Sequence, residues 1–327
     1  MKYPALDLAQ VRTYSIRKRK HLARQTDFAR IPAARDTIEQ FLATLPHILK
    51  ADNFTNLVDT LAAAACKRPV IALLGAHVIK CGLSPVIIDL IQNGLLTHLA
   101  VTGAGAIHDL EVAFFGQTSE EVAGHLRDGT FGMVRETAEI FNAAVAAGEG
   151  EGLGERLGYF FLVREPKFLR YSILATAAEQ KIPATVHVAF GTDTLHQHPG
   201  FDPASVGLLT QHDFKVLAAS VGRLRPGAVV LNIGSAVVLP EVFLKALAVA
   251  RNIIGARKVR GFTAANFDMI QHYRPNVNVV GRPSLGGGTG YAITGHHEIM
   301  LPLLAWAVKA KMQMRGLRIE KSGKSKR

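Results

Sequence analysis

The residues best suited to proton transfer in this chain are histidines near glycine turns. His108 comes shortly after a Gly-x-Gly turn, His198 follows a second turn, and His296 stands two residues before Glu298. Imidazole gains or loses a proton near neutral pH, and a carboxylate serves the same purpose when its surroundings tune it. We therefore predict that His108, His198, His296 and Glu298 transfer protons or contact the substrate.

The same side chains admit two other interpretations. Three of them, His198, His296 and Glu298, offer imidazole and carboxylate groups together with His196 and His297, and such groups bind Zn²⁺ and other divalent ions. A metal-assisted hydrolase or lyase is therefore an alternative hypothesis, although we assign no residue to a metal. The third interpretation is structural, with neutral histidines bonded to the backbone of a polar cleft.

The Gly-x-Gly turn itself predicts a ligand site. An apolar run ends at Thr102, Gly103 and Gly105 follow, and a helix-like pattern begins at once. In an α/β fold such a turn directs free N–H groups and the helix dipole at phosphates. The third glycine of the dinucleotide motif is absent, since His108 holds its place. We predict that Thr102, Gly103 and Gly105 contact a nucleotide, and a tight turn without a ligand is the alternative.

The elements that position these residues alternate along the chain. Apolar runs predict strands at 69–74, 97–101, 185–190, 228–233 and 277–280, and periodic patterns predict helices at 37–66, 84–93, 118–148, 168–180, 203–223, from 240 and from about 297. This alternation favours a doubly wound, mostly parallel α/β sheet of the Rossmann-like class, within one catalytic domain over residues 37–310. Ligands then gather at the carboxyl ends of the strands. The glycine-rich loop 284–290 is a further candidate for contact with a ligand.

Positive charge is concentrated at the two ends of the chain. The net charge is +12, and residues 1–30 and 311–327 each contribute +6, so residues 31–310 are neutral overall. We therefore predict a basic N-terminal extension over residues 1–36 and a basic C-terminal tail over residues 311–327. Solvated tails are the simplest interpretation. A non-catalytic binding protein, whose tails contact an anionic partner, is the alternative.

Apolar runs and cysteines indicate the cellular compartment of the protein. Every apolar run is too short to span a membrane, and Arg17–Lys20 is not followed by the apolar region of a secretory signal. We therefore predict a cytoplasmic protein with no membrane partner. Cys66 and Cys81 lie in apolar surroundings in the sequence, which favours reduced, buried thiols.

From Gly75 to Val122 the chain resembles the deoxyhypusine synthase family. The resemblance rests on Gly-Ala-His-Val-Ile-Lys-Cys-Gly-Leu-Ser from Gly75 and on Leu-Ala-Val-Thr-Gly-Ala-Gly-Ala-Ile-His-Asp-Leu-Glu from Leu99, and the order of later elements fits over residues 37–308. It implies a Rossmann-like sheet that binds NAD, and a homotetramer with sites at subunit interfaces. The family transfers an aminobutyl group from spermidine to a lysine of a translation factor. NAD takes and returns a hydride, and an enzyme lysine carries the imine.

Cofactor residues carry over from the family to matching positions. Thr102 and Gly103 match its nucleotide turn, Asp193 matches its cofactor-side aspartate, and Gly234 and Ser235 match its glycine turn. The resemblance therefore implies that these residues hold NAD.

Departures from the family pattern change the expected chemistry. Ala292 stands where the family has its imine-forming lysine, and no lysine occurs between Lys258 and Lys309. Only a lysine amine supports that imine, and Lys80 is the one lysine near a predicted site. Histidines also stand where the family has acidic residues, at His108, His198 and His296. We therefore predict a divergent enzyme that acts on a polyamine or another small amine, by alkylamine transfer or a related redox step.

Overall fold

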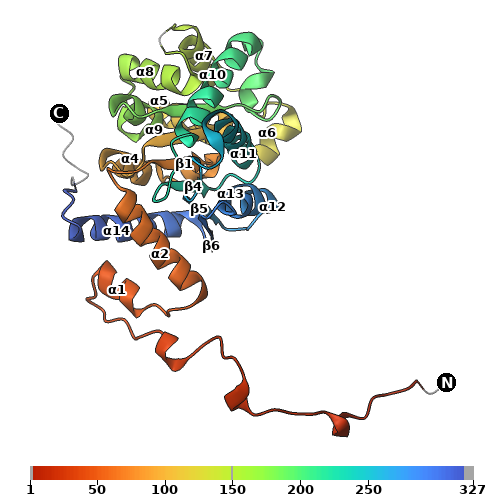
Figure 1. The fold of residues 1–327 in the computed structure, drawn as a ribbon. Coiled ribbons are helices and arrows are strands. Elements are labelled where there is room, and N and C mark those ends of the chain that lie inside the picture. The colour runs from red at the N-terminus through yellow and green to blue at the C-terminus, as the bar shows by residue number, and fades with distance from the viewer. Residues whose placement is uncertain (1–2, 149, 320–327) are drawn as a thin grey trace.

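A six-stranded, all-parallel sheet forms the centre of the molecule (Figure 1). The computed structural model describes residues 3–148 and 150–319. The strand order is β3-β2-β1-β4-β5-β6, with the bounds β1 Val70–Leu74, β2 His98–Thr102, β3 Ala184–His187, β4 Val229–Ile233, β5 Thr263–Asp268 and β6 Thr289–Thr294. The predicted fold class, a doubly wound parallel α/β sheet, is confirmed.

Helices cover both faces of the sheet. Alternate residues of β1 explain this, because Ile71 and Leu73 pack with helices α10 and α11 while Val70, Ala72 and Leu74 pack with α2 and α14. A strand buried on both faces carries a continuous apolar run, which is why β1 and β4 were predictable. The helices are α1 Ile38–Thr44, α2 Leu49–Ala64, α3 Ala76–Lys80, α4 Ser84–Gln92, α5 Gly103–Phe115, α6 Val122–Asp128, α7 Arg135–Ala146, α8 Leu153–Arg164, α9 Ile173–Glu179, α10 Pro203–Val221, α11 Val238–Ala250, α12 Tyr273–Pro275, α13 Arg282–Ser284 and α14 His297–Met314.

The last strand of the prediction is wrong. Residues 277–280 lie in a π-helical turn, Asn276–Gly281, and the sheet instead continues through β5 and β6. β5 consists of small and polar residues around Phe267, and most of the edge strand β6 is only partly buried, so neither shows a long apolar run. A short apolar run does not distinguish a strand from a buried helical turn.

Two predicted helices are interrupted. The helix expected over residues 37–66 is divided into α1 and α2, and Leu49 at the start of α2 has a φ of 53°. The helix expected over residues 118–148 is divided into α6 and α7. Gly129 and Gly132 cause the second break, because both have positive φ, which a helix interior excludes.

The N-terminal segment 3–36 extends away from the rest of the molecule (Figure 1). It contains short 3₁₀ turns at Leu8–Gln10, Ile16–Lys18 and Gln25–Asp27, and its apolar side chains are exposed. The C-terminal tail was predicted over residues 311–327, of which residues 320–327 lie outside the described residues.

Two further observations concern membranes and cysteines. Within the described ranges, every helix is too short or too polar to cross a membrane. The prediction of buried cysteines is wrong for Cys66, which is exposed, and Cys81 is only partly buried. Cys66 follows the end of α2 with a φ of 57°, so its backbone turns out of the helix there.

Candidate functional site

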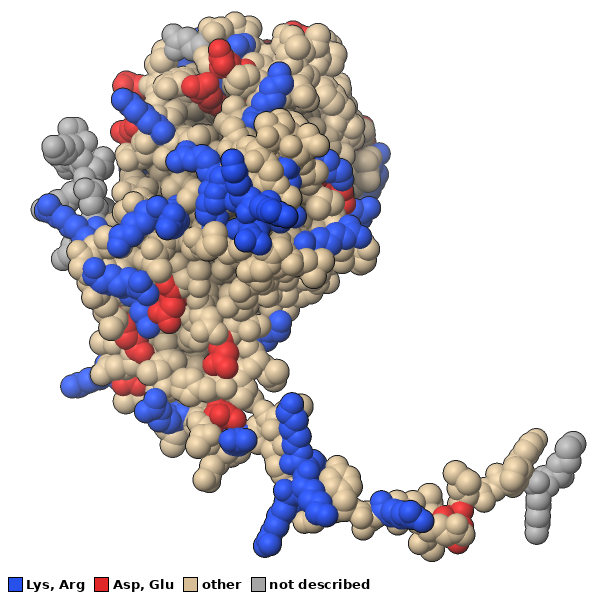
Figure 2. All heavy atoms as spheres, in the orientation of Figure 1, with Lys and Arg blue, Asp and Glu red and all other residues tan. Residues whose placement is uncertain are grey.

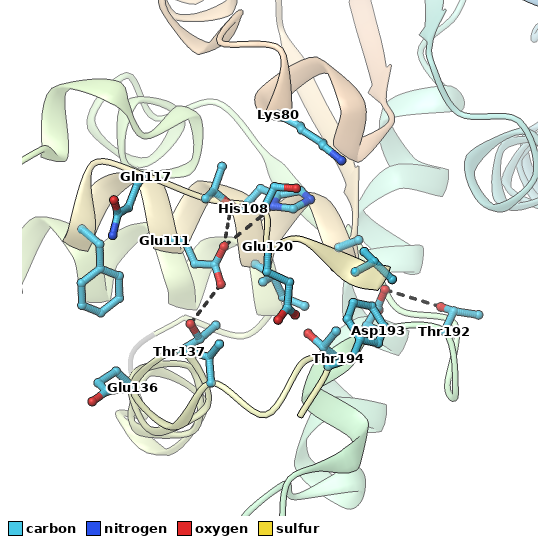
Figure 3. A pocket seen from close by; sticks show the side chains of 18 residues that line it. Lys80, His108, Glu111, Gln117, Glu120, Glu136, Thr137, Thr192, Asp193 and Thr194 are labelled. Atoms are coloured by element: carbon cyan, nitrogen blue, oxygen red, sulfur yellow. Dashed lines mark hydrogen bonds and ion pairs between the residues drawn. The ribbon is translucent and has the colours of Figure 1, made fainter. Parts of the chain in front are cut away.

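A cavity of about 890 Å³ lies at the carboxyl ends of β2 and β3 (Figure 3). Its walls come from α3, α5, α7 and the loop after β3, and most of its polar side chains are carboxylates and hydroxyls. The titratable lining residues, together with two threonines that contact them, are Lys80, His108, Glu111, Thr118, Glu120, Glu136, Thr137 and Asp193. Two residues predicted from the sequence, His108 and Asp193, therefore lie in one cavity.

The turn between β2 and α5 is held by two side chains. Thr102 Oγ1 accepts the Gly105 N–H at 3.1 Å, as an N-cap residue does. Asp193 accepts the Ala104 N–H from the other side, and a Cβ at Gly103 would lie 2.0 Å from Asp193 Oδ2. A side chain at position 103 would therefore displace the Asp193 carboxylate, which packs directly on the backbone. Burial raises the pKa of Asp193 above its usual range.

This arrangement bears on how a dinucleotide would bind. The Ala104 and Gly105 amides, which a pyrophosphate would use, are already bonded to Asp193 and Thr102, and Asp193 adds a carboxylate at the same place. The turn as it stands does not fit a pyrophosphate. The carboxylate oxygens of Asp193 do fit hydroxyl groups such as those of a ribose, because a carboxylate accepts several hydrogen bonds.

A hydrogen-bonded chain crosses the cavity wall from α5 to α7. His108 Nδ1 lies 2.6 Å from Thr118 Oγ1, and Thr118 Oγ1 lies 2.5 Å from Glu111 Oε2. Thr137 donates its hydroxyl to Glu111 Oε1 at 3.0 Å. Burial acts to raise the pKa of Glu111, but nearby His108 and the hydrogen bonds from Thr118 and Thr137 outweigh it and hold that pKa below its usual range.

The chain fixes which nitrogen of His108 carries the proton. An ionised carboxylate can only accept hydrogen bonds, so Thr118 donates its single hydroxyl proton to Glu111. Thr118 must therefore accept a hydrogen bond from His108 Nδ1. Neutral His108 is then protonated at Nδ1, and its Nε2 keeps a free lone pair. Figure 3 shows one ring nitrogen of His108 at the dashed contacts and the other on the far side of the ring. In this arrangement Nε2 of His108 is able to accept a proton, and Thr118 and Glu111 hold the ring in position.

The charge of the cavity favours cationic ligands. Glu111, Glu120, Glu136 and Asp193 contribute four carboxyl groups to the lining, and Lys80 is the only lysine or arginine among the described residues that line it. Carboxylates around a concave site attract ammonium groups and repel phosphates. The cavity is therefore suited to an amine.

The other predicted catalytic residues lie elsewhere. His198 Nε2 bonds to the Gly132 carbonyl oxygen at 2.9 Å, which joins the loop after β3 to the loop before α7. His296 Nδ1 lies 3.7 Å from Glu298 Oε1 at the start of α14, and their side chains are 62% and 50% exposed. Neither histidine lines the cavity. The structure thus brings His108 and Asp193 together, and places His296 and Glu298 beyond β6.

The predicted glycine turn after β4 is a packing site. A Cβ at Gly75 would lie 2.0 Å from the Gly234 carbonyl oxygen, so the loops after β1 and β4 are in backbone contact. Ser235 is buried, and its hydroxyl accepts the Leu239 N–H at the start of α11. Gly234 in turn packs against the buried ring of His297.

A second group of polar side chains surrounds that contact. Cys81 Sγ lies 3.1 Å from His77 Nε2, and the His77 and His297 rings meet edge to face with centroids 5.8 Å apart. Burial lowers the pKa of His77 and raises the pKa of Cys81, so both favour their neutral forms. No three His, Cys, Asp or Glu side chains in the described part of the chain are arranged to hold a metal ion.

Several residues of the cavity were not predicted. Glu111 lies one helical turn after His108, and that spacing is a signal that sequence reasoning could have used. Thr118 and Thr137 carry no such signal, because they reach the site through the break between α5 and α7. Their position depends on the tertiary fold.

The fold is similar to several solved structures at low sequence identity. A candidate LOR/SDH protein of Methanococcus maripaludis S2 gives a TM-score of 0.50 at 12% identity, over 80% of this chain and 70% of that chain. The ternary complex of AgrE with ornithine and NAD⁺ gives 0.52 at 12% identity, over 81% of this chain and 34% of that chain. A candidate deoxyhypusine synthase of Entamoeba histolytica gives 0.51 at 9% identity, over 84% and 92%.

These likenesses show a shared fold. The chain corresponds to about a third of AgrE, whose complex contains NAD⁺. No protein-family model and no curated protein matches the sequence.

Proposed function

We propose that the protein is a divergent deoxyhypusine synthase-like enzyme that binds a polyamine or another small amine in the cavity beside α5. The observation that carries the proposal is the acidic cavity with His108 in its wall, held by Thr118 and Glu111. Carboxylates would bind the ammonium groups of such a substrate, and His108 Nε2 would take one of their protons. The sequence resemblance and the shared fold support the family relation.

Proton removal is the step that the residues of this chain are placed to perform. An amine nitrogen must lose a proton before its lone pair can assist bond changes at the neighbouring carbon. His108 Nε2 would receive that proton, while the bond from Nδ1 through Thr118 to Glu111 stabilises the imidazolium that forms. A redox step or an alkylamine transfer can follow.

NAD is the proposed cofactor, and it would supply a hydride acceptor when bound. The fold and the NAD⁺ complex of AgrE support this part of the proposal. Asp193 would meet ribose hydroxyls, whereas the pyrophosphate would need donors away from the Gly103 turn. The position of the family lysine is Ala292 on β6, so an imine could form only on Lys80, which lines the cavity.

Calorimetry with purified protein tests the two parts separately. We expect spermidine or a related diamine to bind, and Glu111→Gln together with Glu120→Gln to weaken that binding by roughly tenfold or more, since each removes a charged partner. Glu139→Gln, an exposed change on α7 outside the cavity lining, is the control. Unchanged amine binding in the double variant would refute the amine site, and absence of NAD⁺ binding would refute the cofactor alone.

The same fold relation leads us to propose a homo-oligomer, a tetramer by resemblance. The exposed apolar residues of the N-terminal segment support it, with Leu6, Leu22 and Ile31 exposed by 92%, 88% and 95%. Apolar side chains of an extended segment are stabilised when they pack on another surface. We propose that a second copy of the chain supplies that surface, in the cytoplasm.

A further inference from the structure

A second hollow, of about 490 Å³, lies at the amino ends of β5 and β6, whereas the amine cavity lies at the carboxyl ends of β2 and β3. Its lining combines Arg251, Arg257 and Arg260, which precede β5, with Leu285 and the glycines Gly286 and Gly287, which precede β6. Because all strands are parallel, the loops before them meet at their amino ends, whereas the amine cavity lies at their carboxyl ends. The glycine-rich loop 284–290, a predicted candidate for ligand contact, therefore belongs to this hollow and not to the amine cavity.

The loops at this edge are uniformly basic. Residues 65–69, 222–228, 251–262 and 281–288 contain nine Lys or Arg and no Asp or Glu. Figure 2 shows Lys and Arg side chains gathered over the middle of the visible face, with little acidic surface among them. Arg251, Arg257 and Arg260 form no ion pair within the described residues. The positive charge of this edge is therefore not neutralised within the described chain.

One of the arginines is fixed in place. Arg251 donates from Nε to the Val259 carbonyl oxygen at 3.0 Å and from Nη2 to the Pro283 carbonyl oxygen at 3.3 Å. These bonds tie the loops before β5 and β6 together and orient the guanidinium without neutralising it. Arg257 and Arg260 are exposed and remain free to move onto a ligand.

The glycine turn completes the hollow. A Cβ at Gly286 would be in van der Waals contact with both arginines, 3.4 Å from Arg260 Cβ and 3.5 Å from Arg251 Nη2, so the glycine turn lies directly beside them. Gly287 has a φ of 87°, a conformation that L residues rarely adopt. A turn without side chains lets a ligand approach the backbone closely.

We propose that this hollow binds a small ligand that carries two or more phosphate groups. Guanidinium groups match phosphate oxygens in pairs, and three of them around one hollow suit several phosphates better than one. The volume lies within the range of small-molecule sites. A nucleic-acid strand is less favoured, because the only aromatic residue in these loops, Phe262, is buried and offers no stacking surface.

Binding of inorganic tripolyphosphate to the full chain tests the proposal. We expect saturable binding that spermidine does not displace, since the hollow and the amine cavity lie at opposite ends of the strands. Arg257→Ala and Arg260→Ala should each weaken binding by roughly tenfold, as expected for loss of a charged hydrogen bond. Both residues are exposed, so these variants should keep the wild-type melting temperature.

Control variants separate this hollow from general positive charge. Arg135→Ala removes an exposed arginine of α7 and should leave binding unchanged. Replacing all of Arg17–Lys20 with alanine tests the N-terminal segment in the same way. The proposal is overturned if either control weakens binding as much as Arg257→Ala does. It is also overturned if an oligonucleotide or an anionic lipid vesicle binds while tripolyphosphate does not.

Discussion

At the scale of single residues, the carboxylate of Glu111 determines which nitrogen of His108 is protonated, although two hydrogen bonds and Thr118 lie between them. The Nδ1 of His108 donates a hydrogen bond to Thr118, because Thr118 itself donates its hydroxyl proton to Glu111. A threonine between a histidine and a carboxylate therefore selects the tautomer that leaves Nε2 free. The residue type His108 was predictable, but its direction of proton transfer depends on Thr118, which comes from outside the helix.

Substitution of Thr118 tests this relay. In Thr118→Val the hydroxyl is lost, so His108 is no longer held as the Nδ1–H tautomer, and we expect turnover of the amine to fall by on the order of a hundredfold. Thr118→Ser should restore most of the rate. The nitrogen NMR shifts of His108 report the tautomer without any substrate.

The matched control is Thr137→Val, which removes the other hydroxyl from Glu111 but leaves the His108–Thr118 bond intact. It should change turnover much less than Thr118→Val does. Equal losses in the two variants, with an unchanged His108 tautomer, would argue against the relay.

At the scale of elements, the sheet was predicted where its strands form long apolar runs, and it was missed at β5, which is fully buried but made of small and polar residues, and at the partly exposed β6. Long apolar runs made two strands predictable, β1 at Val70–Leu74 and β4 at Val229–Ile233. β5 and β6 are held in the sheet by their neighbours, and their sequences are small, polar or partly exposed. The glycine loop 284–290 was recognised as a candidate for ligand contact, but its place at the amino end of β6 could not be predicted, because that strand was missed.

Backbone contact between the loops after β1 and β4 makes Gly75 sensitive to substitution. In Gly75→Ala the added methyl would lie 2.0 Å from the Gly234 carbonyl oxygen, and backbone cannot move aside as a side chain does. We expect a loss of about 1–3 kcal/mol in the free energy of unfolding, as for other overpacked sites, measured by urea denaturation.

Gly207→Ala provides the comparison. Gly207 lies in α10 with nothing within 4 Å of its Cβ position, so alanine should raise the free energy of unfolding by roughly 0.5–1 kcal/mol through helix propensity. If Gly75→Ala were as stable as Gly207→Ala, the close approach of the two loops would be wrong.

At the scale of the whole molecule, one buried carboxyl group joins three elements. Asp213 on α10 accepts N–H groups from Gly154 on α8 at 2.9 Å and from Val186 on β3 at 2.7 Å. Burial raises the pKa of Asp213 to about 7 despite these bonds. Burial likewise raises the pKa of Asp109, which holds the start of α9, to about 6.

These shifts give stability a definite pH dependence. A pKa raised in the folded state means that the folded state binds the proton more tightly, so the stabilisation is complete below about pH 4 and is lost as the pH rises towards 7. Urea denaturation between pH 4 and pH 7 should show this decline, and Asp213→Asn should flatten it while Asp109 keeps a part. A decline as steep in Asp213→Asn as in the wild type would contradict the assignment.

The extended N-terminal segment predicts how the molecule assembles. Deletion of residues 1–30 removes most of the exposed apolar side chains of that segment, so we expect a smaller oligomer in light scattering. The melting temperature checks that the α/β body stays folded. An unchanged mass in a folded variant would refute the role of the segment in assembly.

The separation of charge between the two edges of the sheet has a consequence for motion. Residues 31–310 carry no net charge, yet carboxylates gather at the carboxyl ends of β2 and β3 and guanidinium groups at the amino ends of β5 and β6. A molecule with this separation of charge has a large electric dipole moment. The field of a charged surface would therefore orient the molecule, although it would exert little net attraction on residues 31–310. Ions of opposite sign would approach the molecule from opposite directions. An amine and a phosphate compound would therefore bind at the same time without contact between them, the amine in the acidic cavity and the phosphate in the basic hollow.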